Sequence, residues 1–161
     1  MNRVLVSMQE GLEEPEWLGK IECYEQEVLK RLGFDGQELS VLFCNDEFIR
    51  ELNKNYREID SPTDILSFEN GEEYTDEEGL KWLSVGDIII SLDTLPKNAE
   101  YFKVSQNEEL KRLLIHGTLH LNGMDHGEEH VAEGVEITCP MLKKQEEILR
   151  SFSDFELIEG L

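Results

Sequence analysis

The chain has 161 residues, of which 39% are hydrophobic, which is enough to bury the core of a single domain spanning 1–161. Fifteen basic and 36 acidic residues give a net charge of −21, which argues against non-specific binding to nucleic acid. No apolar run approaches the roughly 18 residues of a membrane span, and the N-terminus lacks a signal-peptide pattern. We therefore expect a cytoplasmic protein with no membrane partner.

The first part of the chain alternates between strand and helix patterns. Residues 3–8 predict a short strand, and apolar residues at helical spacing predict a helix from Pro15 to about Leu32. Residues 38–44 predict a second strand, after which Asn45 can cap a second helix. That helix is expected to bury the following side chains in the core rather than present them to nucleobases: Phe48, Ile49, Leu52 and Tyr56.

Two more strands are predicted at 63–69 and 84–91. Six acidic residues crowd the interval that begins at the end of the first of them: Glu69, Glu72, Glu73, Asp76, Glu77 and Glu78. The simplest interpretation of this run is a solvated loop, and the alternative is a role in excluding wrong substrates.

Helices follow in the second half. We predict a short helix over 93–102, a helix capped by Ser105, and a last helix that contains Met141 and Leu149. Together the elements predict an α+β (mixed α/β) fold, in which a sheet of roughly four strands packs with about five helices. Three cysteines lie far apart without a C-x-x-C pair and are expected to be reduced, mostly buried thiols: Cys23, Cys44 and Cys139.

Three of the four histidines fall within eleven residues. His116 and His120 are one helical turn apart, so their imidazoles leave the same face of the helix. Asn122-Gly123 then predicts the end of the helix, and a turn there would bring His126 back towards the other two. Three imidazoles with a fourth position left for water suit a catalytic Zn²⁺, although Ni²⁺ or another first-row divalent metal is also compatible. The alternative is a pair of histidines at the edge of the helix and an unrelated one in a loop.

The same spacing occurs in the zinc-peptidase signature H-E-x-x-H-x-x-G-x-x-H, with one difference. In that signature, a glutamate directly after the first histidine is the general base. Here the position is Gly117, which cannot accept a proton. A metal-dependent peptidase or small-molecule hydrolase is therefore an alternative that lacks its usual proton acceptor.

At these residues the chain resembles the YbeY family of bacterial metal-dependent endoribonucleases. The run from His116 to His126 contains every fixed position of the signature H-G-x-L-H-L-x-G-x-D-H. Further matching blocks are Asn53 to Arg57, Pro62 to Phe68 with Asp60 before it, and Gly86 to Ile88 with Ser91 after it. The resemblance implies a small mixed sheet flanked by helices, with the metal in a cleft, and a role in ribosomal RNA maturation and ribosome quality control.

Arg57 is the candidate for a second catalytic role beside the ligand His116. A guanidinium near a zinc cleft offers two parallel donors to phosphate oxygens, and the resemblance implies that the matching arginine is functionally important. The alternative is that it pairs with the helix dipole or a nearby carboxylate. Asn53, one turn earlier, is a weaker candidate for substrate binding.

Two carboxylates are candidates for holding a ligating imidazole from behind. Asp125 is adjacent to His126, and it could either orient that ring or take a proton from bound water. Asp87 opens a strand and could act in the same way or simply cap a turn. His130 could be a fourth ligand, but a closed site would be structural, so we expect it at the loop surface.

The leading hypothesis is a zinc-dependent endoribonuclease that hydrolyses single-stranded or precursor ribosomal RNA, including the 3′ end of small-subunit RNA. The RNA substrate follows from the resemblance, because no basic patch with aromatic residues announces it. Expected partners are the small ribosomal subunit or its proteins and an Era-type GTPase. The remaining alternative is a non-catalytic, metal-stabilised module that binds the ribosome.

Overall fold

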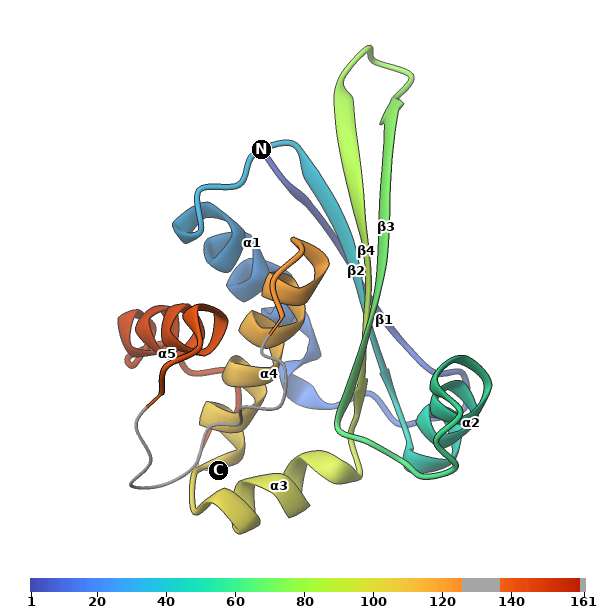
Figure 1. Cartoon of the computed structure of the whole chain (residues 1–161), viewed down its shortest axis with the longest axis vertical. Coiled ribbons are helices and arrows are strands. Elements are labelled where there is room, and N and C mark those ends of the chain that lie inside the picture. The colour runs from blue at the N-terminus through green and yellow to red at the C-terminus, as the bar shows by residue number, and fades with distance from the viewer. Residues whose placement is uncertain (126–136, 160–161) are drawn as a thin grey trace.

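A computed structural model describes residues 1–125 and 137–159, which form a sheet with helices on both faces (Figure 1). In chain order the elements are β1 (Arg3–Met8), a 3-10 helix (Glu16–Lys20), α1 (Ile21–Arg31), β2 (Gln37–Cys44), α2 (Asp46–Arg57), β3 (Ile65–Thr75), β4 (Lys81–Ser91), α3 (Thr94–Phe102), α4 (Gln106–Leu121) and α5 (Pro140–Ser151).

The strands of the described part are ordered β1-β2-β4-β3. β1 pairs in parallel with β2, and β2 pairs in parallel with β4. β3 pairs antiparallel with β4, so the two form a hairpin at the edge of the sheet. These elements confirm the prediction of an α+β fold with a four-stranded mixed sheet and five helices.

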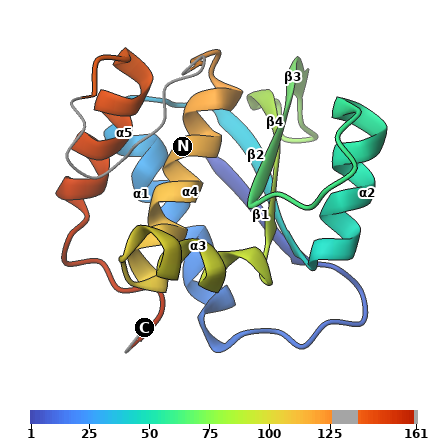
Figure 2. The ribbon, with the colours of Figure 1, turned by 60° about the horizontal axis from the view of Figure 1, so that its bottom comes forward.

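The helices divide unequally between the two faces of the sheet. Figures 1 and 2 show α1 and α4 on one side, with α5 packed against α4, and α2 on the other side. Side chains alternate along β4, so Ile88 and Ile90 join the core under α1 and α4, whereas Ile89 joins a smaller core under α2. Within the described residues, no helix is long and apolar enough to span a bilayer.

A side-chain cap places the start of α2. Asn45 caps α2 by accepting a hydrogen bond from the Phe48 amide at 2.9 Å, as predicted. The helix predicted from Pro15 to Leu32 is divided, because a 3-10 helix occupies Glu16–Lys20 before α1 begins. Gly19, a poor helix former, lies in that 3-10 segment.

The acidic run is strand as far as Thr75, not a loop throughout. β3 extends the predicted strand by six residues and pairs with β4 up to Thr75 and Lys81, while its acidic side chains stay exposed. Asp76 closes the hairpin: its carboxylate accepts hydrogen bonds from the amides of Glu78 and Leu80 and from the indole of Trp82, each at 2.9 Å. Charged side chains on an edge strand oppose pairing with strands of other chains. The acidic side chains of β3 therefore suit its position at the edge of the sheet.

Candidate metal centre

α4 carries the histidines at the edge of the core. Ser105 caps its first turn by accepting a hydrogen bond from the Glu108 amide at 3.0 Å, as predicted. The helix ends where expected, since Gly123 has a φ of +85° and its amide donates to the His120 carbonyl at 3.0 Å. One face of the helix is buried against the core: Leu110, Leu113, Leu114, Gly117 and Leu121.

Two glycines allow α4 to lie close to the sheet. A Cβ atom on Gly117 would meet the Ile88 side chain at 3.0 Å and the Ile65 side chain at 3.1 Å. Gly86 on β4 has a φ of +140°, where other residues are strained, and its Cβ would lie 2.9 Å from the Leu121 side chain. Gly117 therefore faces the strands, and a side chain at this position would contact Ile88 and Ile65 more tightly than ordinary van der Waals packing.

His116 and His120 converge on one point. Their Nε2 atoms lie 3.1 Å apart, their ring centroids 4.6 Å apart, and their planes cross at 75°. Both side chains are half-buried. The structure thus brings two of the three predicted ligands together, and both present the same type of nitrogen.

This separation fits a shared cation. Two imidazole nitrogens bound at tetrahedral angles to one zinc ion are about 3.3 Å apart. The third predicted ligand, His126, and also His130 lie outside the described residues. Within residues 1–125 and 137–159, no three His, Cys, Asp or Glu side chains are grouped as a metal site, so a complete site needs a donor from elsewhere in the chain.

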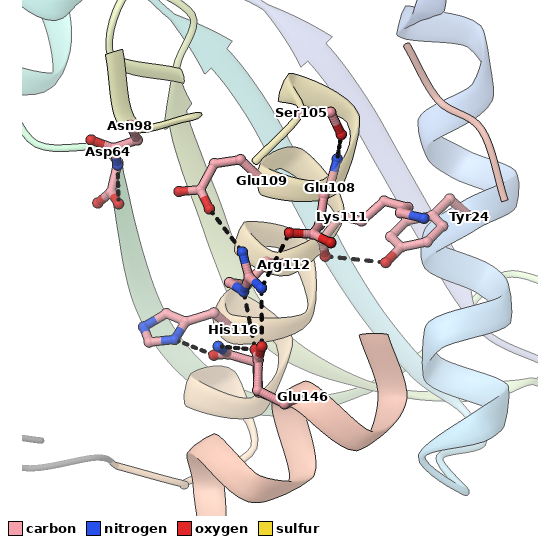
Figure 3. Close-up of polar contacts among 11 residues, drawn as sticks. Tyr24, Asp64, Asn98, Ser105, Glu108, Glu109, Lys111, Arg112, His116 and Glu146 are labelled. Atoms are coloured by element: carbon pink, nitrogen blue, oxygen red, sulfur yellow. Dashed lines mark hydrogen bonds and ion pairs between the residues drawn. The ribbon is translucent and has the colours of Figure 1, made fainter. Parts of the chain in front are cut away.

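Gln145 on α5 contacts His116 from behind. The Nδ1 atom of His116 lies 2.7 Å from the side-chain oxygen of Gln145, which can only accept a hydrogen bond. The Gln145 amide nitrogen donates to Glu146 at 3.0 Å, and Arg112 donates twice to the same carboxylate at 3.0 Å. Figure 3 shows Arg112 reaching between Glu109 and Glu146 beside His116.

The charges around Arg112 follow from burial and pairing. Burial raises the pKa of the Glu146 carboxyl, but hydrogen bonds from Arg112 and Gln145 outweigh it and lower that pKa overall. Burial raises the pKa of Glu109 to about 7 in spite of the attraction of Arg112. Burial also raises the pKa of Asp64, which accepts a hydrogen bond from Asn98 at 2.8 Å.

Arg57 ends α2, on the face of the sheet opposite α4 (Figure 2). Its guanidinium is exposed, and among the described residues it forms no ion pair or side-chain hydrogen bond. Asn53 is buried and donates to the Ser61 carbonyl at 2.9 Å, so its amide holds the segment that follows Arg57. Tyr56, predicted to be a core residue, is instead 69% exposed, because its ring packs edge-on against Phe68 of the edge strand and is otherwise uncovered.

The two predicted supporting carboxylates are placed differently. Asp87 is exposed and accepts a hydrogen bond from Ser40. Its position next to Ile88 directs it to the sheet face opposite α4, so the structure does not bring it to the histidines. Asp125 is exposed just after α4, and its carbonyl accepts from the Cys139 thiol at 3.6 Å.

Comparison with known proteins assigns the chain to a family. The family model of endoribonuclease YbeY matches residues 7–153. The chain belongs to the YbeY family. It is 52% identical to Endoribonuclease YbeY of Treponema denticola over 138 residues, which are 86% of this chain and 85% of that protein. It is 46% identical to the Aquifex aeolicus member over 131 residues, 80% of this chain and 82% of that protein.

A solved structure is also similar. The solution structure of TM1509 from Thermotoga maritima covers 100% of this chain and 99% of its own, with a TM-score of 0.56 and 26% sequence identity. Membership of the YbeY family confirms the resemblance seen in the sequence and the prediction that the chain is an endoribonuclease.

Sequence reasoning about the YbeY motifs missed Gln145. Gln145 lies on the buried side of α5. The other buried residues of that helix are all apolar: Met141, Leu142, Ile148 and Leu149. A lone amide on an apolar helix face was the available signal, since a buried amide needs hydrogen-bond partners.

Proposed function

We propose that the chain is a zinc-dependent endoribonuclease that cuts single-stranded precursor ribosomal RNA, including the 3′ end of small-subunit RNA, and takes part in ribosome quality control in the cytoplasm. The observation that carries the metal site is the pair of Nε2 atoms 3.1 Å apart on α4. His116, His120 and His126 would hold the ion. When bound, zinc would lower the pKa of a water molecule to about 7 and polarise a phosphoryl oxygen.

Arg57 is proposed to bind a backbone phosphate of the RNA. Because α2 lies on the face of the sheet opposite α4, the bound strand would pass around the β3 edge between Arg57 and the metal. The exposed guanidinium of Arg57 has no carboxylate partner in the described part of the chain, so it is available to an anion. Asn53 is proposed to support substrate binding indirectly. Its side chain donates a hydrogen bond to the Ser61 carbonyl and so fixes the segment that follows Arg57.

The surface beside Arg57 suits a single strand. Lys54 is also exposed, and the exposed ring of Tyr56 contacts Phe68 edge-on. An aromatic face next to two cations can stack a base while the cations contact the backbone. The remaining surface is strongly acidic, which favours basic partners such as proteins of the small ribosomal subunit, and an Era-type GTPase is a further candidate.

Cleavage of an unstructured RNA by three purified variants tests this function. We expect His116→Ala to abolish cleavage and Arg57→Ala to slow it by about 10- to 100-fold at limiting RNA, the effect of losing a hydrogen bond from a charged donor. Lys30→Ala, which removes an exposed cation of α1, is the matched control and should cut like the parent. If His116→Ala and Arg57→Ala both retain the parental rate, the assigned site is wrong.

A further inference from the structure

We propose that Gln145 is a positioning residue that fixes which nitrogen of His116 is available to a metal, an inference that rests on the proposed metal site. It acts from α5, through the side of the imidazole that faces away from His120. Three side-chain contacts, each with a defined donor, support this assignment.

The first contact sets the position of the hydrogen on His116. The Gln145 side-chain oxygen lies 2.7 Å from His116 Nδ1 and has no hydrogen to give. Nδ1 must therefore carry the hydrogen, and Nε2 of a neutral ring must then present its lone pair. That lone pair is on the side of His120, whose own Nε2 is 3.1 Å away.

The second contact prevents the Gln145 amide from turning round. Its nitrogen donates to a Glu146 oxygen at 3.0 Å. A flipped amide would set its oxygen against that carboxylate, and two acceptors would then face each other without a hydrogen between them. Gln145 is only 2% exposed, so water cannot readily replace the lost hydrogen bond.

The third contact fixes Glu146. Arg112 of α4 donates to its two oxygens through Nε and Nη2, both at 3.0 Å, in a bidentate pair that is more rigid than a single hydrogen bond (Figure 3). Arg112 is one turn before His116 on the same helix. A path of hydrogen bonds thus runs from Arg112 on α4 through Glu146 and Gln145 on α5 and back to His116 on α4.

The tautomer of His116 can be measured without any metal. In metal-free protein with ¹⁵N-labelled histidine at pH 8, two-bond ¹H–¹⁵N spectra should show His116 with its hydrogen on Nδ1, and the signals missing from His116→Ala identify it. Gln145→Met, which keeps the length of the side chain and removes both the acceptor and the donor of the amide, should shift His116 towards the Nε2–H form. An Nε2–H tautomer in the parent, or an unchanged tautomer in Gln145→Met, overturns the proposal.

Zinc affinity gives the second readout, by competition with a fluorescent chelator. Gln145→Met should bind zinc about 10- to 100-fold more weakly than the parent, the usual effect of removing a hydrogen-bond partner of a ligating histidine. Gln26→Met is the matched control, because it makes the same substitution at an amide that donates to the Asn2 carbonyl. Parental affinity in Gln145→Met, or an equal loss in Gln26→Met, contradicts the positioning role. By contrast, parental affinity in His116→Ala would refute the metal site itself and leave the tautomer result standing.

Discussion

Gly117 shows how one residue separates this site from a peptidase site with the same histidine spacing. It directly follows His116 on α4, at the position where the peptidase signature has its general base. In this fold the position faces Ile88 and Ile65 of the sheet, which a Cβ atom would meet at 3.0 and 3.1 Å, closer than ordinary van der Waals contact. Tight packing of the ligand-bearing helix on the strands thus disfavours a glutamate at this position.

Gly117→Ala should therefore destabilise the fold. The added methyl would press against Ile88 at 3.0 Å, and overpacking of this kind typically costs about 1–3 kcal/mol. Gly19→Ala is the control, since a Cβ there meets no atom within 4 Å. Urea denaturation of the two variants would measure the difference in the free energy of unfolding. Equal stabilities would mean that α4 does not need glycine at this contact.

Between elements, α1 and α4 share a buried polar contact, which joins Glu25 to Thr118. Thr118 Oγ1 lies 2.8 Å from a Glu25 carboxyl oxygen and 2.7 Å from the Leu114 carbonyl. The hydroxyl has one hydrogen, so a protonated Glu25 that donates to Thr118 satisfies both contacts. Burial agrees with this arrangement, because it raises the pKa of Glu25 to about 8.

This contact predicts a pH dependence of stability. A carboxyl with a raised folded-state pKa holds its proton more tightly in the folded state than in the unfolded state, so the free energy of unfolding falls as pH rises from about 4.5 to about 8. Each unit of pKa difference corresponds to about 1.4 kcal/mol. Glu25→Gln has no carboxyl proton to lose at this position. As pH rises from 5 to 8, its free energy of unfolding should therefore fall less than that of the parent.

Urea denaturation across that pH range would measure the difference. Glu22→Gln, at an exposed position of the same helix, is the control and should follow the parent. Glu109 also has a raised pKa, about 7, but it is present in all three proteins and cancels in the comparison. Parallel curves for the parent and Glu25→Gln would show that Glu25 is ionised in the fold.

Considered as a whole, the molecule carries a negative net charge, which opposes RNA binding. The net charge of −21 repels RNA, and the β3–β4 hairpin adds an exposed acidic edge. Lys54 and Arg57 are exposed cations at the end of α2, on the opposite side of the sheet from α1 and α4 (Figure 2). RNA binding at this place should therefore depend on few phosphate contacts.

The salt dependence of binding tests that view. Two cations on a single strand give a slope of log affinity against log salt of about −1.4, so affinity should fall only about sevenfold between roughly 50 and 200 mM salt. Arg57→Ala should reduce the slope by about 0.7. Fluorescence anisotropy with a labelled single-stranded RNA would measure both. A slope of −4 or steeper would require a basic surface elsewhere on the protein.

Local order was largely determined by the sequence. The element types, the caps at Asn45 and Ser105, and the pairing of His116 with His120 follow from residues within one or two helical turns of each other. Such features depend on backbone periodicity and on hydrogen bonds between near neighbours, which the order of residues specifies directly. The position of His126 stays a prediction, since it lies outside the described residues.

Contacts between distant segments were decided only by the tertiary structure. Gln145 meets His116 across 29 residues, Gly117 packs closely on the strands beneath it, and Tyr56 is exposed although its spacing is that of a core residue. Periodicity tells which side chains share one face of an element, but not which other element covers that face. That choice is made by packing of the whole chain, so the residues that orient the ligand could be found only in the folded molecule.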